Sequence, residues 1–225
     1  MFTAAHLPVT SFHPVVLGTV PPSSKCQSVH FFLDFSNIGI GAQQLAIEYG
    51  DSHFDLRHLR LHSQHLRDIA LRGRKWGSGF AAAGLGANGH GLHRRFAAVG
   101  IEFQCTERGR ETGREQGVDE IIQSKMLRLL HRDPANDVIV LATGDGNGYE
   151  DDRGFVSTLK LLRSHGYQIE VLAWEHSLSQ KLKEWALDHG HVHLLDQLFA
   201  ELTFVEGRRF AKPLGNYFKK LRPAT

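Results

Sequence analysis

Cysteine is scarce in this sequence, which contains only two in 225 residues. Cys26 and Cys105 lie far apart and have none of the short spacings that are typical of metal sites. Two isolated cysteines cannot form the disulfide framework of a small secreted protein. The pattern is compatible with a reducing compartment, so we expect an intracellular protein, either cytoplasmic or nuclear.

Long hydrophobic runs are also missing. No apolar stretch reaches the roughly 18 residues that a membrane-spanning helix needs, so we expect no membrane association. The first apolar cluster, Val15 to Leu17, is preceded by no Lys or Arg and therefore lacks the charged start of a secretion signal.

The signature motifs of two large enzyme classes are absent as well. The sequence has no Gly-x-Ser-x-Gly, which marks α/β-hydrolases, and no Gly-Lys-Ser/Thr, which binds phosphate in P-loop NTPases. The net charge of +2 is too small to indicate a nucleic-acid partner by itself. With 41% hydrophobic and 22% charged residues, the composition is that of an ordinary globular protein.

Two apolar segments that end in aspartate are the clearest features present. Residues 138–142 (Val-Ile-Val-Leu-Ala) lead into residues 143–145 (Thr-Gly-Asp), and residues 29–33 (Val-His-Phe-Phe-Leu) lead into Asp34. A continuous apolar run predicts a strand that is buried on both faces. Open α/β sheets place their chemistry just beyond the carboxyl ends of such strands. We therefore expect Asp34 and Asp145 at a functional edge of the sheet.

Strands and helices alternate over most of the chain, which predicts an α/β fold with a parallel sheet covered by helices on both faces. The predicted strands are 29–34, 101–105, 138–142, 169–173 and 191–195. The predicted helices are 116–131, 154–165 and 178–187, with another from Asp196. A turn at 35–37 and a helix over 53–71 complete the pattern. We expect an extended arm over 1–27, one domain over 28–206 and a basic tail over 207–225.

A glycine motif opens a second functional hypothesis. Gly84, Gly86 and Gly89 match the G-x-G-x-x-G fingerprint of dinucleotide-binding folds, and Glu102 and Glu107 lie near the distance expected for its acidic partner. The fingerprint must follow a strand and open a helix. Because residues 76–83 are rich in Gly and Ala, they are a poor strand. A flexible turn is therefore favoured, and a nucleotide-cofactor oxidoreductase is kept as an alternative.

The acids at the predicted strand ends could belong to one cluster. The candidates are the carboxylates at two strand ends, at a helix start and in the following loop: Asp34, Asp119, Asp145 and one of Glu150, Asp151 and Asp152. Carboxylates in one cleft repel one another unless a cation offsets their charge. Oxygen ligands suit Mg²⁺ or Mn²⁺, which can activate water for attack on a phosphate. Alternatively, each acid only orders its own turn, loop or helix start.

Histidines and a basic tail offer weaker signals. The spaced histidine sets could bind zinc but contain no complete zinc motif, so solvated surface histidines are favoured: His58, His62 and His65, and His189, His191 and His193. The predicted tail carries six basic residues interleaved with aromatic ones: Arg208, Arg209, Lys212, Lys219, Lys220 and Arg222. It could bind an RNA backbone or could be a solvated segment.

The order of the acidic motifs resembles the NYN domain, a branch of the PIN-like nucleases. The motifs are Asp-x-x-Asn at 34–37, Val-Asp at 118–119, Thr-Gly-Asp at 143–145 and a Ser-x-x-Leu helix start at 179–182. The resemblance covers about residues 29–200. Residues 115–123 look like those of a fungal-type subgroup.

The resemblance implies a fold and an activity. The implied fold is a PIN-like three-layer α/β/α sandwich, whose mainly parallel sheet has five or six strands in the order 3-2-1-4-5. The implied activity is a metal-dependent endoribonuclease that hydrolyses RNA with Mg²⁺ or Mn²⁺. The catalytic, metal-binding acids would be Asp34, Asp119 and Asp145, with Asp152 as a further metal ligand. The residues expected beside the substrate are Ser36, Asn37, Thr143, Glu150 and Asp151.

The sequence also departs from the family pattern. The pattern places an acid directly before a phenylalanine, but Gly154 precedes Phe155 here. Ser124 and Lys125 stand where relatives often have another acid. A catalytically weak or inactive RNA-binding or scaffold module on the same fold is therefore the main alternative.

Overall fold

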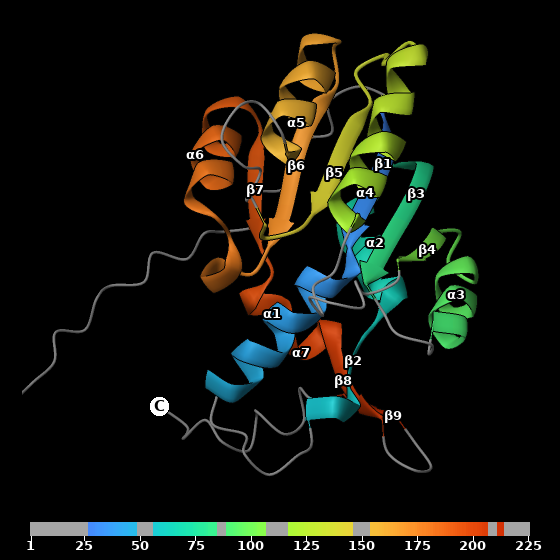
Figure 1. Cartoon of the computed structure of the whole chain (residues 1–225), viewed down its shortest axis with the longest axis vertical. Helices are drawn as coiled ribbons and strands as arrows, with labels where there is room; N and C mark the ends of the chain where they lie inside the picture. The colour runs from blue at the N-terminus through green and yellow to red at the C-terminus, as the bar shows by residue number, and fades with distance from the viewer. Residues whose placement is uncertain are drawn as a thin grey trace, which may run out of the picture.

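The fold is built on a parallel sheet of six strands in the order β4-β3-β1-β5-β6-β7 (Figure 1). A computed structural model describes residues 27–48, 56–84, 89–106, 117–145, 154–206 and 211–213. The strands are β1 (Ser28–Asp34), β3 (Lys75–Gly84), β4 (Glu102–Thr106), β5 (Val138–Ala142), β6 (Gln168–Ala173) and β7 (His191–Leu194). The first five follow the predicted order 3-2-1-4-5, and β7 is added beside β6.

Helices cover both faces of this sheet, which confirms the predicted three-layer α/β/α architecture (Figure 1). One face carries α4 (Val118–Leu127), α5 (Phe155–Ser164) and α6 (Gln180–His189). The other carries α1 (Phe35–Glu48), α2 (Ser63–Leu71), α3 (Gly89–Ala97) and α7 (Phe199–Leu202). Among the described residues, no helix is both long and apolar enough to cross a membrane.

The central strands face two hydrophobic cores at once. In β5, Val138 and Val140 pack into the core under α1 and α2, whereas Ile139 and Leu141 pack into the core under α4 and α5. All four side chains are fully buried. The two cores explain why the strand sequence is apolar throughout rather than alternating.

Strand β3 corrects the prediction that residues 76–83 are a poor strand. Its glycines are required by close packing: a Cβ on Gly77 would lie 2.8 Å from His30 Cε1, and one on Gly79 would lie 2.5 Å from the Trp76 ring. Val29 pairs with Trp76 and His30 with Ser78, so Gly77 is the extra residue of a bulge. Glycine here marks close packing within a strand rather than a flexible turn.

Two further predictions are corrected in the segment between β1 and β3. The turn expected at 35–37 is the first turn of α1, which begins directly at Phe35. A single helix is expected over 53–71, but helix α2 begins only at Ser63, because Leu59–Leu61 forms strand β2. Leu59 and Leu61 are buried on one face of β2, a period of two that helical spacing obscured.

Strand β2 belongs to a small second sheet, in which it pairs antiparallel with β8 (Thr203–Glu206) and β8 with β9 (Ala211–Pro213). Strand β9 lies within the segment predicted as the tail. The extents of the arm, the domain and the tail otherwise stay predictions, because residues 1–26 and 214–225 lie outside the described part of the chain.

A buried ionic cluster ties α2 to the central sheet. Glu170 on β6 is 3% exposed and accepts two hydrogen bonds from Arg74, at 2.7 and 2.8 Å, and one from Arg72. Burial favours a raised pKa for Glu170, but the hydrogen bonds from Arg74 and the two arginine charges outweigh it and lower that pKa. The carboxylate therefore stays ionised and holds the end of α2 against β6.

His193 on β7 completes this cluster as a neutral side chain. An Arg72 guanidinium nitrogen lies 3.2 Å from His193 Nδ1, which must be unprotonated to accept that hydrogen bond. Burial and the charge of Arg72 lower the pKa of His193 from 6.5 to about 4. The neutral ring is thus favoured by folding, and its contribution to stability is complete above pH 6.5 and lost as the pH falls towards 4.

Acidification should therefore destabilise the protein through His193. A pKa difference of this size corresponds to at most about 3 kcal/mol of unfolding free energy between pH 7 and pH 4. The variant His193→Gln, which does not titrate, should show a shallower loss when unfolding by urea is measured across this range. The exposed His131→Gln serves as the control. Parallel stability curves for the parent and His193→Gln would contradict the assignment.

Candidate active site at the carboxyl edge of the sheet

The candidate site lies where the direction of chain winding changes. Strands β1 and β5 are neighbours, but the chain continues from β1 towards β3 on one side and from β5 towards β6 on the other. Such a switch point leaves a crevice beyond the carboxyl ends of the two strands, where α/β proteins bind their ligands. Asp34 ends β1, and Asp145 follows β5 by three residues.

Asp34 is largely buried at this edge, with 5% of its surface exposed. Its Oδ1 accepts the backbone N–H of Asn37 at 3.0 Å, so it caps the first turn of α1. Its Oδ2 lies 3.5 Å from the Thr143 hydroxyl, at the long limit of a hydrogen bond. The same carboxylate thus orders a helix start and faces the segment that follows β5.

The two residues after Phe35 connect β1 to the strands on either side. The Gly84 N–H at the end of β3 donates to Ser36 Oγ at 3.0 Å. The Gly144 N–H beyond β5 donates to Asn37 Oδ1 at 2.7 Å. Both side-chain oxygens therefore already bind backbone amides, so the structure gives Ser36 and Asn37 a bracing role. Their predicted contacts with substrate stay predictions.

The turn after β5 is fixed by close packing on the loop after β6. A Cβ on Gly144 would lie only 2.4 Å from the carbonyl oxygen of Ser177, so this position admits only glycine. The Ser179 N–H donates to the Gly144 carbonyl at 2.8 Å, and Ser179 Oγ caps α6 by accepting the Leu182 N–H. The Asp145 N–H donates to Thr143 Oγ1 at 3.1 Å. The Thr-Gly-Asp and Ser-x-x-Leu motifs are therefore parts of one structure.

Trp174, a residue that sequence reasoning missed, holds α1 in place over this loop. Its indole N–H donates to the Ile38 carbonyl at 2.8 Å, and the ring is fully buried. A Cβ on Gly41 would lie 2.4 Å from the ring, so α1 approaches the indole as closely as glycine permits. Its only signal in the sequence is an aromatic residue directly after a predicted strand.

Asp119 lies at the start of α4, where Gly117 turns the backbone with φ of 80°. The chain leaves the parallel strand β4 at the carboxyl edge and enters β5 at the amino edge, so α4 begins at the same edge as Asp34. Val118 is buried beside it, whereas Asp119 is half-buried. Asp119 therefore lies at the same edge of the sheet as Asp34. Its close approach to Asp34 and Asp145 stays a prediction.

The carboxylate and hydroxyl oxygens at this edge are ligands of the chemical type that a hard cation prefers. Asp34 and Asp145 supply carboxylates and Thr143 a hydroxyl, and Mg²⁺ and Mn²⁺ prefer such oxygen ligands. Among the described residues, no three His, Cys, Asp or Glu side chains are grouped to hold a metal ion. The remaining predicted acids lie outside the described residues: Glu150, Asp151 and Asp152.

The glycine motif meets only part of the dinucleotide hypothesis. Gly84 ends strand β3 and Gly89 opens helix α3, as the fingerprint requires, while Gly86 lies outside the described residues. In dinucleotide-binding folds, however, the fingerprint follows the first strand at the switch point. Here that position is the β1–α1 junction, which carries Asp34 instead of glycines.

The spaced histidines take part in packing. The His62 ring lies 4.3 Å from the Phe204 ring and 4.7 Å from the His65 ring, centroid to centroid. Burial, followed by the charges of His65 and Arg95, lowers the pKa of His62. His65 Nδ1 lies 2.7 Å from the Glu201 carbonyl oxygen. These contacts place His62 and His65 beside β8 and α7.

Comparisons with known proteins identify the family. A solved structure of a protein of unknown function from Vibrio parahaemolyticus matches with a TM-score of 0.52 and 14% identity, over 76% of this chain and 93% of that chain. At this identity the likeness shows the fold alone. No curated protein matches the chain. The family model of the NYN domain matches residues 29–189, without distinguishing a fungal-type subgroup. Because this match spans well over half of the 225 residues, the chain belongs to the NYN domain family.

Proposed function

We propose that this NYN domain is a divalent-metal-dependent endoribonuclease whose site is the crevice between the ends of β1 and β5. The observation that carries the proposal is the pairing of Asp34 with the Thr143–Asp145 turn at the switch point, braced by the hydrogen bond between Gly144 and Asn37. NYN domains are generally PIN-like nucleases. RNA is the substrate that this family membership favours.

Each residue has a defined part in the proposed chemistry. Asp34 and Asp145 would hold Mg²⁺ or Mn²⁺, with Asp119 and Asp152 as further acids of the site. The bound ion would activate a water for attack on the phosphodiester and stabilise the charge that develops on it. Thr143 orients Asp34 through its hydroxyl. Ser36 holds the end of β3 against the first turn of α1, and Asn37 holds the turn after β5 against it.

A catalytically silent RNA-binding or scaffold module is the second candidate. Two observations favour it: Asp34 already caps α1, and Gly154 stands before Phe155 where the family pattern has an acid. A scaffold would bind no RNA, whereas a nuclease and a silent RNA-binding module would both bind it. They differ in whether RNA is cleaved and whether cleavage depends on a metal ion.

A nuclease assay separates the two candidates. Labelled single-stranded and hairpin RNAs should be cleaved internally with Mn²⁺ or Mg²⁺ and should stay intact in EDTA. The variant Asp34→Asn should lower the rate by roughly a hundredfold or more, since the ion supplies several kcal/mol of transition-state stabilisation. Asparagine caps helices as well as aspartate, so this variant should keep its fold. Binding of RNA without cleavage would select the silent module.

The variant Asp145→Asn should show whether Asp145 binds the metal ion or only orders its loop. If Asp145 helps to hold the ion, millimolar Mn²⁺ should raise the melting temperature of the parent far more than that of the variant. At a hundred times the dissociation constant the parent gains roughly 2.7 kcal/mol. In EDTA the variant should be equally or more stable, because repulsion between carboxylates is relieved.

Asp188→Asn, on the exposed part of α6, is the control for this comparison. If Asp145 only orders its loop, Asn should cost about 1 kcal/mol or more in EDTA through lost hydrogen bonds. A variant that melts lower in EDTA, yet gains as much from Mn²⁺ as the parent, would contradict a metal-binding role.

Asn37→Ala should reveal the brace between α1 and β5. The substitution leaves the buried Gly144 N–H without its acceptor, which should cost about 1–3 kcal/mol of unfolding free energy. It should also weaken the stabilisation by Mn²⁺, because the Asp145 turn loses its support. Urea unfolding with and without Mn²⁺ measures both effects, with the nearby Gln44→Ala as control. A loss no larger than that of Gln44→Ala would refute the bracing role.

A further inference from the structure

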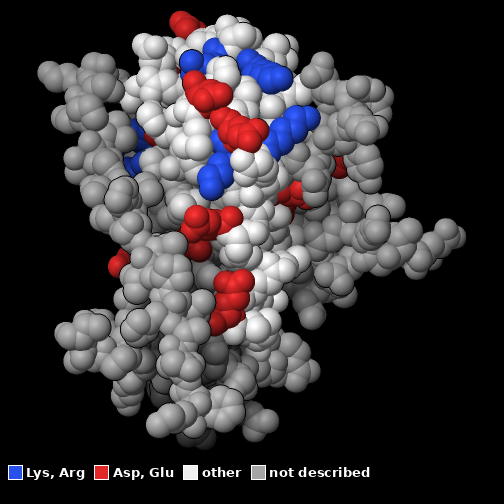
Figure 2. Space-filling view, turned by 90° about the vertical axis from the view of Figure 1, so that its left-hand side faces the viewer, with Lys and Arg blue, Asp and Glu red and all other residues white. Residues whose placement is uncertain are grey.

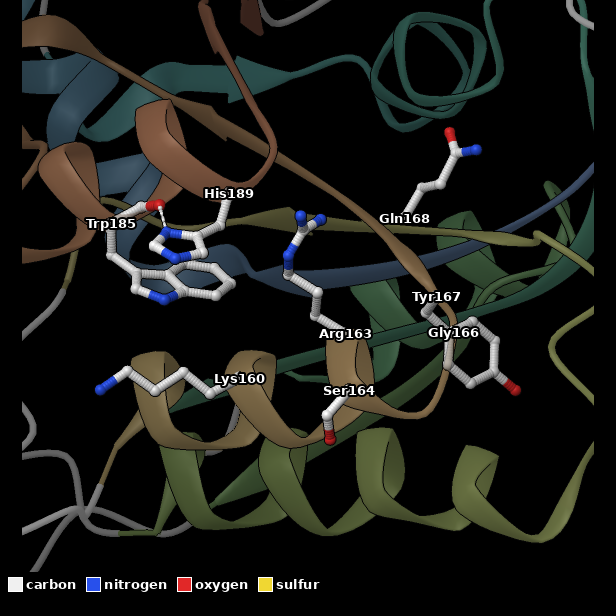
Figure 3. Close-up of a pocket in the computed structure, with 8 residues that line it drawn as sticks. All are labelled: Lys160, Arg163, Ser164, Gly166, Tyr167, Gln168, Trp185 and His189. Carbon is white, nitrogen blue, oxygen red and sulfur yellow. Dashed lines mark hydrogen bonds between the residues drawn. The ribbon is translucent and has the colours of Figure 1, made fainter.

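A groove of about 790 Å³ lies between α5 and α6, at the amino edge of the sheet (Figure 3). Its polar lining includes Lys160, Arg163 and Ser164 on α5 and Gln168 at the start of β6. Trp185 and His189 on α6 form the opposite wall. The groove is at the far end of both helices from the proposed active site and is a separate feature of the surface.

The charge of the groove is of one sign. Lys160 and Arg163 are exposed and three residues apart, so they lie on one side of α5. No Asp or Glu lines the groove, and no carboxylate of the described residues pairs with either cation. By contrast, Arg72, Arg74 and Lys125 each pair with a glutamate. Two cations in a hollow that pair with no described carboxylate favour an anionic occupant.

The surrounding surface does not share this bias. The side of the molecule on which α6 lies carries basic and acidic side chains intermixed towards the amino edge, and acidic ones towards the carboxyl edge (Figure 2). A general attraction of anions to this side is therefore not expected. Arg163 is in the last turn of α5, where a cation also stabilises the helix end. Lys160 is one turn earlier, beyond the range of that effect.

The wall formed by α6 is aromatic. The Trp185 and His189 rings are stacked with centroids 5.3 Å apart and planes 4° apart. His189 Nδ1 lies 3.0 Å from the Trp185 carbonyl oxygen, which holds the histidine against the indole (Figure 3). Cations on one wall and aromatic rings on the other match a single nucleic-acid strand, which presents phosphates and flat bases.

We propose that the α5–α6 groove binds the backbone of an RNA strand that extends from the active site, an inference that rests on the proposed nuclease function. Both helices begin at the carboxyl edge, and the start of α6 contacts the Asp145 turn through Ser179 and Gly144. A helix of ten residues spans about 15 Å. A strand must therefore extend several nucleotides past the cleavage point to reach Lys160 and Arg163, so long RNAs gain from the groove and very short ones do not.

RNA binding in EDTA tests this proposal apart from cleavage. The probes are a fluorescent single-stranded 12-mer and a trimer of RNA, with affinity measured by anisotropy at several salt concentrations. The charge reversal Lys160→Glu with Arg163→Glu should weaken 12-mer binding at least tenfold at low salt. It should also reduce the salt slope by about 1.4, which is two phosphate contacts at 0.7 each. Trimer binding should change less than twofold.

A matched charge reversal away from α5 and α6, Lys75→Glu with Arg94→Glu, changes the net charge equally outside the groove and should have less than a twofold effect. Equal losses of 12-mer affinity in both double variants, or an unchanged affinity in the groove variant, would overturn the proposal that the groove binds RNA. Displacement of the 12-mer by equimolar AMP would also overturn it by showing a mononucleotide pocket. If the reversed variant does not fold, Lys160→Gln with Arg163→Gln takes its place. Because this variant removes the two charges without reversing them, its loss of 12-mer affinity should be about half as large on a logarithmic scale.

Failure of the groove and failure of the proposed function have different signatures. If the parent binds the 12-mer through Lys160 and Arg163 but never cleaves RNA with Mn²⁺, the groove stands and the nuclease does not. If the parent cleaves RNA and the reversed variant has the same KM for the 12-mer, the nuclease stands and the groove is refuted. The KM for the trimer provides the internal control.

Discussion

The hydrogen bond from the Gly144 N–H to Asn37 Oδ1 joins the two strand ends on which the candidate site depends. The sheet places β1 beside β5, but residues beyond the strand ends have no ladder partners and need other acceptors. Asn37 supplies one from the first turn of α1, and Asp34 caps that same turn. Trp174 then fixes α1 through the Ile38 carbonyl. The acids therefore stand on elements that are held to one another rather than on independent loops.

The two roles of Asp34 are compatible. A carboxylate at a helix N-terminus is stabilised in its ionised form by the macrodipole, and the ionised form is the one that a cation requires. Helix α1 can therefore offset part of the cost of burying this charge in the crevice. The buried Glu170 cluster shows the same principle at the opposite edge, where two arginines hold an ionised carboxylate. Buried acids in this fold are retained with specific partners.

Much of the fold could be predicted from local patterns, and the exceptions share a physical cause. The strands β1 and β5 can be predicted from their apolar runs because both of their faces are buried. The acids that follow them indicate the carboxyl edge of the sheet. Strand β3 and helix α1 were obscured by glycines whose purpose lies in distant contacts: Gly77 meets His30, and Gly41 meets Trp174. Likewise, no local pattern could tell that Asn37 binds Gly144. Contacts between remote segments, rather than propensities, decide these positions.

The proposed function requires that a divalent cation binds between the ends of β1 and β5. Crystals of the full chain grown with Mn²⁺ and measured at a wavelength where manganese scatters anomalously would test it directly. We expect an anomalous peak in this crevice, at bonding distance from a carboxylate oxygen of Asp34 or Asp145. A peak found only elsewhere on the protein, or no peak at saturating Mn²⁺, would show that this crevice is not a cation site.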